Sequence, residues 1–225
     1  MKWKNLFWLF ALAGLWGPSF LFIKVAVEDF PPLTLVFGRL ALGAVILWTA
    51  LRLKKRRLPR SRQVWRHLAV MALVQNAFPF VMFAWGEQHI DSALASILNG
   101  MTPMFTILLA HFFVDDDRLN LPKFLGVVFG FGGLVLLVAP AILDGMTSTV
   151  WGLMAVVLAA TSYGVALVYS RLHLRGLPPL VAPAGQMIAA SLYLLPVSLI
   201  FERPYTLPTP SLASLGSLVA LGVFG

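Results

Sequence analysis

The sequence LAGLWGPSFLFIKVAVEDFPPLTLVFGR at residues 12–39 contains two apolar runs separated by an acidic turn with a Pro-Pro pair. The first run continues to Val27 with one charged residue, Lys24, and the second begins at Leu33. Each run extends beyond the quoted stretch to roughly 20 residues, the length that a helix needs to cross the hydrocarbon core of a bilayer. The stretch therefore predicts two membrane-spanning helices joined by a short turn.

The composition of the whole chain also indicates a membrane protein. Of its 225 residues, 59% are hydrophobic and 12% are charged, and the mean hydropathy is +0.85. Water-soluble globular proteins have about 45–50% apolar and about 25% charged residues. Apolar runs of this length favour helices over the shorter alternating strands of an outer-membrane barrel. We predict an all-α, polytopic membrane helix bundle with helical segments near residues 5–27, 33–52, 67–86, 92–114, 122–143, 149–170, 179–201 and 212–225, the last of which is short.

The basic residues lie mostly on one side of these segments. With a cytoplasmic amino terminus, 14 of the 17 Lys and Arg residues fall on the cytoplasmic side, eight of them within residues 52–66. Short loops rich in Lys and Arg stay on the cytoplasmic side of a membrane. The distribution predicts a multi-pass protein of the bacterial inner membrane with its amino terminus in the cytoplasm.

Three charged or terminal segments allow other interpretations. The basic segment 52–66 lacks interleaved aromatic residues and any nucleic-acid motif, so we predict contact with the lipid bilayer and no nucleic-acid partner. The opening residues up to Ala13 resemble a signal peptide, but the apolar run continues to Val27, which favours a membrane helix. The acidic triplet 115–117 resembles half of a magnesium site, but no second acidic pair lies on the same side, which favours a solvated loop.

The sequence lacks the residue patterns of common catalytic and metal sites. It has no cysteine, and its four histidines are scattered, so we predict no metal site and no cofactor. It also has no GxSxG, HExxH, GxGxxG or P-loop motif. We therefore predict that the protein is not an enzyme and is not driven by ATP.

An internal repeat relates the two parts of the chain. A shift of 147 residues, without a gap, aligns residues 12–51 with 159–198; seven of these 40 positions are identical, and four of the seven are Gly or Pro. Because one unit holds five helices, an odd number, the second copy enters the membrane from the opposite face, and the loop charges invert accordingly. We predict a first repeat at 1–143 and a second, inverted repeat at 149–225. Inverted repeats of this kind build a transport path near the midplane of the membrane.

The repeat also predicts how long two full copies would be. Two copies would end near residue 290, at about 143 plus 147, so the second copy is incomplete in this sequence. We therefore expect the chain to hold eight of about ten helices and to be truncated at its carboxyl end.

Several motifs, in this order and spacing, resemble those of EamA-type members of the drug/metabolite transporter superfamily. The resemblance covers essentially all 225 residues. The motifs are Trp16-Gly17-Pro18-Ser19-Phe20, Pro31-Pro32 followed by Arg39, residues 92–98 leading to Thr102-Pro103, Asp117-Arg118-Leu119 (the family has Glu at the first position), and Leu125-Gly126 through Gly132-Gly133. The resemblance implies ten helices in two inverted five-helix repeats, and transport of small metabolites or amino acids across the bacterial inner membrane.

Arg39 is the main candidate for a substrate-binding residue. It lies about seven residues into the second helix, roughly 10 Å below the outer boundary. A charge at that depth is costly unless it is paired, hydrated or able to reach the headgroups. Arg39 either binds a carboxylate or phosphate, or it pairs with Glu28 or Asp29 or reaches the headgroups, and both interpretations stay open. Lys24 is expected to extend to the outer interface.

Further polar and aromatic residues indicate where a cavity would lie. Asn99, Thr102 and Thr106 share one face of the fourth segment, in which Pro103 predicts a kink, and they serve either as substrate contacts or as hydrogen bonds between helices. Residues at corresponding positions of the repeat, and polar residues of the third segment, complete the predicted substrate-binding set: Trp16, Ser19, Gln75, Asn76, Tyr163 and Gln186. The Gly126-to-Gly130 GxxxG motif predicts a close helix contact.

These observations lead to one functional hypothesis and two alternatives. The hypothesis is a secondary transporter, an exporter of small organic metabolites or amino acids, that works by alternating access through a central cavity. A membrane-embedded enzyme and a non-transporting membrane scaffold are the alternatives; missing catalytic motifs disfavour the first, and the inverted repeat disfavours the second. No buried acidic residue stands out as a proton carrier, because Glu87 and Asp91 are expected at the outer edge. Facilitated diffusion and proton exchange through Glu87 both stay open, as do substrate identity and the choice between monomer and homodimer.

Overall fold

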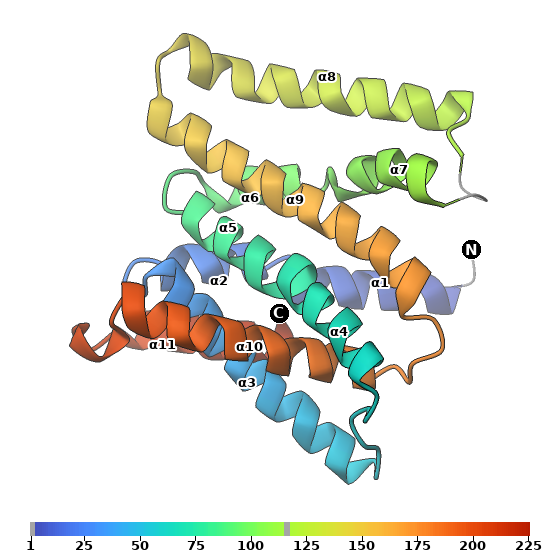
Figure 1. Ribbon diagram of the computed structural model, residues 1–225. Coiled ribbons are helices and arrows are strands. Elements are labelled where there is room, and N and C mark those ends of the chain that lie inside the picture. The colour runs from blue at the N-terminus through green and yellow to red at the C-terminus, as the bar shows by residue number, and fades with distance from the viewer. Residues whose placement is uncertain (1–2, 115–117) are drawn as a thin grey trace.

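The computed structural model describes residues 3–114 and 118–225, which form helices and contain no β-strand (Figure 1). The described helices are α1 (Trp3–Trp16), α2 (Ser19–Ala26), α3 (Pro32–Leu53), α4 (Arg62–Met71), the π-helical turn η1 (Ala72–Ala77), α5 (Phe78–Gly86), α6 (Ser92–Asn99), α7 (Thr102–Phe113), α8 (Leu121–Leu143), α9 (Thr147–His173), α10 (Val181–Phe201), the 3-10 turn η2 (Pro204–Thr206) and α11 (Leu212–Phe224).

Seven segments of the described chain are long and apolar enough to cross a membrane. They are Leu6–Ala26, Pro32–Leu53, Arg62–Gly86, Ser92–Phe113, Leu121–Leu143, Thr147–His173 and Val181–Phe201, and the shorter apolar helix α11 follows them. This confirms the predicted all-α, multi-pass membrane bundle. The acidic triplet 115–117, for which a solvated loop is predicted, lies outside the described residues.

Three of the spanning segments are interrupted, two of them at a proline. The first breaks between α1 and α2, where Pro18 precedes the first residue of α2. The third contains the turn η1, in which the backbone widens by one residue. In the fourth, α6 ends at Asn99 and α7 begins at Thr102, with Pro103 in its first turn. This interruption lies at Pro103, where the sequence predicts a kink.

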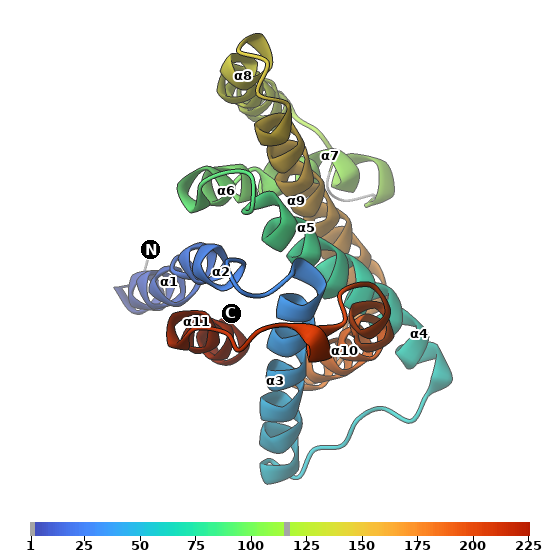
Figure 2. The same ribbon diagram turned by 90° about the vertical axis from the view of Figure 1, so that its left-hand side faces the viewer.

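The helices run back and forth between two ends of the bundle. The turns after α2, α5, α8 and α10 gather at the left-hand end in Figure 1, and helices α3, α7 and α9 end at the opposite end. Helix α9 packs between α5 and α7, while α10 packs along α3. Helices α1, α2 and α11 lie on one side of α3, as the turned view shows (Figure 2).

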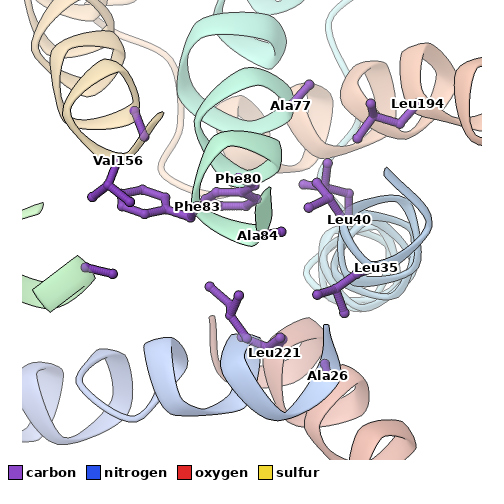
Figure 3. Close-up of a cluster of buried hydrophobic side chains, with 14 of the residues drawn as sticks. Ala26, Leu35, Leu40, Ala77, Phe80, Phe83, Ala84, Val156, Leu194 and Leu221 are labelled. Carbon is purple, nitrogen blue, oxygen red and sulfur yellow. The ribbon is translucent and has the colours of Figure 1, made fainter. Parts of the chain in front are cut away.

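The main hydrophobic core lies where α5 meets the helices on both sides of it. Phe80 and Phe83 of α5 lie between α3 and α9, and Figure 3 shows them facing Leu40 on one side and Val156 on the other. Leu221 of α11 closes the cluster from below in this view. Because α2, α3, α5, α9 and α11 all contribute, this core joins segments from both ends of the chain.

Close helix contact occurs at a different glycine pair from the one that the GxxxG motif predicts. A Cβ atom at Gly126 would have no described atom within 4 Å, whereas one at Gly130 would lie 2.6 Å from the sulfur of Met104. The prediction is therefore wrong for Gly126 and correct for Gly130. The closer backbone approach is between α5 and α9, where a Cβ at Gly86 would lie 3.0 Å from the Gly152 carbonyl oxygen and a Cβ at Gly152 would lie 3.1 Å from that of Gly86.

Candidate functional site

Arg39 lies in the second turn of α3 and is enclosed by protein, with 8% of its surface exposed. Its guanidinium carbon lies 3.8 Å from the centre of the Phe80 ring, which is the geometry of a cation–π contact. Its Nε atom is buried without a hydrogen-bond partner. The structure shows Arg39 neither at the headgroups nor paired with Glu28 or Asp29, so the structural alternatives weighed for it are wrong.

The two acidic residues considered as partners of Arg39 are engaged or exposed elsewhere. The carboxylate of Asp29 accepts hydrogen bonds from the backbone N–H and the hydroxyl of Ser211, at 2.9 and 2.6 Å. These bonds hold the pKa of Asp29 below its ordinary value. Glu28 is exposed to solvent. Arg39 is therefore a buried cation for which the described residues provide an aromatic ring rather than a carboxylate.

The Phe80 ring that contacts Arg39 belongs to a group of aromatic side chains. Tyr163 of α9 lies 6.5 Å from Phe80 and 5.8 Å from Phe83, measured between ring centres. Tyr163 and Glu87 are the groups that act electrostatically on Arg39. Arg39 and Tyr163, two residues of the predicted set, thus lie near the same rings of α5, one on the α3 side and one on the α9 side.

A second polar pair lies one helical turn away along the same segment. The side-chain amide of Asn76 donates to the Oε1 atom of Gln186 at 3.4 Å, and both side chains are buried. Asn76 belongs to η1 and precedes Phe80 by four residues, so the pair is close to the Arg39 group. The widened turn η1 leaves the Val74 carbonyl oxygen free to accept a hydrogen bond from the Ser162 hydroxyl at 2.7 Å. Such π-helical turns are common at functional sites.

No hydrogen bond or ring contact joins the other predicted residues to this group in the part of the chain that the structure describes. Gln75 lies half-buried in η1, and Ser19 is half-buried at the start of α2. Trp16 is 59% exposed at the end of α1. Thr102 donates to the Asn99 carbonyl at 2.8 Å, and Thr106 donates to the Thr102 carbonyl at 2.9 Å, so these hydroxyls are satisfied within their own segment rather than between helices.

The side chains of Glu87 and Lys24 are both held by other parts of the bundle. Glu87 immediately follows α5 and has no exposed surface, and neither of its carboxylate oxygens has a hydrogen-bond partner. Lys24 does not extend to the interface; its Nζ atom donates to the carbonyl oxygens of Glu87 and Ile90, at 2.6 and 2.8 Å. The expectation that Lys24 extends outward is therefore wrong. Glu87 lies at the predicted edge, directly after the spanning segment Arg62–Gly86, but it is enclosed by protein. The sequence contains one sign that Glu87 is unusual: it follows the carboxyl end of a helix, where a negative charge is unfavourable because of the helix dipole.

Two grooves lie away from these polar groups. One, of about 540 Å³, lies between α6, α7 and α8 and is lined mainly by apolar residues such as Met104 and Leu134. The other, of about 450 Å³, lies between α3, α5 and α9 beside Trp85 and Trp151. None of the ten predicted residues lines either groove. Among the residues that the structure describes, no three His, Cys, Asp or Glu side chains converge on a point that could hold a metal ion.

Comparison with known proteins places this geometry in context. The model of the EamA-like transporter family matches residues 3–139. The uncharacterized transporter YoaV of Bacillus subtilis (strain 168) is 28% identical over 199 residues, which are 88% of this chain and 68% of that protein. The uncharacterized inner membrane transporter YedA of Escherichia coli (strain K12) is 28% identical over 226 residues, which are 96% of this chain and 71% of that protein.

The fold also resembles that of a solved protein. A crystal structure matches with a TM-score of 0.61 and 21% sequence identity, covering 95% of this chain and 74% of the other. This likeness concerns the helix arrangement.

Proposed function

Because the chain belongs to the EamA-like transporter family, we propose that it is a secondary transporter that exports small organic metabolites or amino acids across the bacterial inner membrane. Membership of the family supports transport in general, whereas the substrate, the direction and the mechanism are our proposal. The substrate class that we propose is small organic carboxylates, amino acids included. We further propose that movement occurs by alternating access between two inverted repeats, 1–143 and 149–225.

The buried cation Arg39 is the observation that carries the substrate class. Enclosing a guanidinium in a bilayer-spanning bundle is costly, so such a group is by default a functional one. Its planar fork of N–H donors fits a carboxylate in two-point fashion. The Phe80 ring holds the guanidinium in place without neutralising its charge. Tyr163, Asn76 and Gln186 add hydrogen-bonding groups nearby, and we propose them as the remaining contacts of a small polar substrate.

Contacts at both ends of the bundle agree with a closed path around this group. At the end that holds the α2–α3 turn, Glu202 caps α3 by accepting from the backbone N–H groups of Leu33 and Thr34, at 2.9 and 2.6 Å. At the other end, the Nδ1 atom of His67 lies 2.8 Å from the Tyr169 hydroxyl. Each contact joins the two proposed repeats. Opening one end and then the other would require these contacts to break in turn.

Reconstitution tests the proposed function. Proteoliposomes that contain the protein would be loaded with radiolabelled aspartate, glutamate, phenylalanine and succinate, and the release of each would be followed with chemical analysis of the released compound. We expect release of at least one unaltered compound above the rate of empty liposomes. A chemically changed product would instead support the membrane-embedded enzyme. Absence of any movement would contradict the proposed substrate class, and loss of label from preloaded cells tests the outward direction.

The proposed orientation predicts opposite exposure of two loops. Lys55 follows α3, and Tyr205 follows α10; both are exposed. Because the chain has no native cysteine, Lys55→Cys and Tyr205→Cys each introduce a single thiol. We expect a membrane-impermeant thiol reagent added to intact cells to label residue 205 and to label residue 55 after the membrane is opened. Labelling of both residues from the same side would contradict the inverted repeat.

The contact between Glu202 and the start of α3 is expected to keep the outer end of the bundle closed, and this effect can be measured. The carboxylate of Glu202 also accepts from the Thr34 hydroxyl at 2.7 Å, and the same hydroxyl lies 3.0 Å from that of the buried Ser198. Hydrogen bonds to a charged group contribute about 1.5–3 kcal/mol. In a protein carrying Ser198→Cys, Glu202→Ala should therefore speed labelling of that thiol from outside by roughly tenfold or more. Glu28→Ala, a change at an exposed residue on the same side, is the matched control and should leave the rate unchanged.

A further inference from the structure

Glu87 is an enclosed carboxyl group that the proposed substrate site does not use. It has no exposed surface, and both carboxylate oxygens lack a hydrogen-bond partner. A native protein rarely leaves an ionised carboxylate in that state, because loss of hydration is not repaid by any bond. The neutral, protonated form removes most of that penalty.

The helices around Glu87 bring few charges to it. Helix α2 contributes Lys24, whose ammonium group is bonded to the backbone carbonyls of Glu87 and Ile90 rather than to the carboxylate. Helix α3 contributes Arg39, which acts on Glu87 electrostatically while its guanidinium lies over Phe80. Helix α9 contributes Tyr163, which acts on Arg39.

The remaining neighbours are apolar or uncharged. The turn η1 and helix α6 contain no Asp, Glu, Lys, Arg or His, and α9 carries its charged residues in its last turn, at the opposite end. Past Glu87 in the chain, the half-buried His89 bonds to the Trp85 carbonyl at 3.2 Å, and Asp91 is exposed. The buried side chains of Phe83 and Ile90 belong to the hydrophobic core. Burial raises the pKa of Glu87 to about 8, against the opposing influence of Lys24 and Arg39.

We infer that Glu87 is a proton-binding site linked to anion binding at Arg39, so that a proton and an anionic substrate cross the membrane together. This inference rests on the proposed function. Glu87 and a substrate carboxylate compete for the same cation. When the substrate is bound, a negative charge on Glu87 is repelled and loses the influence of Arg39, so protonation is favoured. When the substrate leaves, Arg39 again lowers the proton affinity of Glu87, so the proton is released more readily to a compartment of higher pH.

The linkage is reciprocal by thermodynamic necessity. If anion binding raises proton affinity at Glu87, protonation of Glu87 raises anion affinity at Arg39 by the same factor. Such co-transport is compatible with export, because the outward gradient of an accumulated metabolite can carry the proton with it. An acidic exterior would in turn drive the anion inward.

Infrared difference spectroscopy tests the proton site without any substrate. In the wild-type protein, a carboxylic acid C=O band should be present at neutral pH and disappear with a midpoint near pH 8, and Glu87→Gln should lack it. Lys24→Met should move the midpoint upward, because the Lys24 charge opposes protonation of Glu87. Glu28→Gln, at an exposed residue, is the matched control and should retain the band. The same spectra for wild type and Glu87→Gln would overturn the inference.

Thermal stability provides a second readout of the same group. The pKa of Glu87 rises from 4.5 in the unfolded chain to about 8 in the folded protein, so the folded protein keeps this proton up to a higher pH. Its contribution to stability is therefore fully present below about pH 4.5 and is lost as the pH rises through 8. The Tm of the wild type should fall over that interval, and Glu87→Gln should flatten the fall. An unchanged slope in Glu87→Gln would contradict a protonated Glu87.

Transport in proteoliposomes tests the linkage. With radiolabelled aspartate and glutamate outside and no membrane potential, an acidic exterior should drive accumulation of about tenfold per pH unit in the wild type. Glu87→Gln should show no accumulation, and Glu28→Gln should behave as the wild type does. If the wild type moves these anions but does not accumulate them in response to the pH gradient, the linkage is wrong and the proposed function still stands. No wild-type exchange at all would contradict the proposed substrate class, and the infrared titration would still decide whether Glu87 holds a proton.

Discussion

Replacing Arg39 with alanine is expected to lower transport of anionic solutes by roughly 10- to 100-fold while the amount of folded protein in the membrane stays the same. The physical reason is that hydrogen bonds to a charged group contribute about 1.5–3 kcal/mol, and each 1.4 kcal/mol is a factor of ten. In the structure, Arg39 is buried, and its Nε atom has no partner to lose. Its removal also relieves the protein of an uncompensated buried charge, so folding should not suffer. Solute release from proteoliposomes, normalised to protein content, is the measurement.

Arg52→Ala provides a matched control on the same helix. Arg52 also lies over an aromatic ring, with its guanidinium carbon 5.3 Å from the centre of Trp48, but it is exposed at the end of α3. We expect this variant to transport as the wild type does. Arg39→Lys keeps the charge but loses the planar fork, so an intermediate rate is expected if two-point binding matters. An Arg39→Ala protein with unaltered transport, or with protein loss that accounts for the whole defect, would assign Arg39 to folding.

The helical fold was predictable from the sequence because hydropathy and backbone chemistry act locally. Apolar runs of membrane-spanning length, separated by turns such as the one at 28–32, correspond to the observed helices. Pro18 marks the observed break between α1 and α2, because proline has no backbone N–H to donate within a helix. The widened turn η1 carries no such marker: its sequence, ALVQNA, is compatible with an ordinary helix. Its shape is accompanied by a bond from Ser162, which is far away in the chain.

The candidate site was only partly predictable because a membrane helix has few cues to its inward face. A helix that is apolar all round has no single hydrophobic stripe, so helix rotation is set by packing between segments. Arg39 stood out because its charge lies deep in an apolar run, and Asn76 and Gln186 stood out as polar groups. Nothing local indicates that Phe80 faces Arg39. The surroundings of Glu87 likewise include Lys24, which bonds to the Glu87 carbonyl from 63 residues away in the chain.

The contact between α5 and α9 leads to the second large effect, on stability. Gly152→Leu is expected to destabilise the protein by about 3 kcal/mol, because even a Cβ atom at this position would lie 2.8 Å from the Cβ of His89 and 3.1 Å from the Gly86 carbonyl oxygen. A larger side chain must therefore push the two helices apart. For a chain of this size, that loss corresponds to a fall in Tm of about 6–12 °C. Thermal unfolding in detergent is the measurement.

The same substitution at Gly126 separates packing from helix propensity. Gly126 lies on the exposed face of α8, and a Cβ atom there would have no described atom within 4 Å. Leucine favours a helix over glycine by roughly 0.5–1 kcal/mol, so Gly126→Leu should leave the Tm unchanged or raise it slightly. Because α5 carries Phe80 and Phe83 and α9 carries Tyr163, Gly152→Leu should also displace the aromatic group around Arg39 and slow transport. If both leucine variants had the Tm of the wild type, the close approach of α5 and α9 would be wrong, and with it the enclosure of Glu87 directly after Gly86.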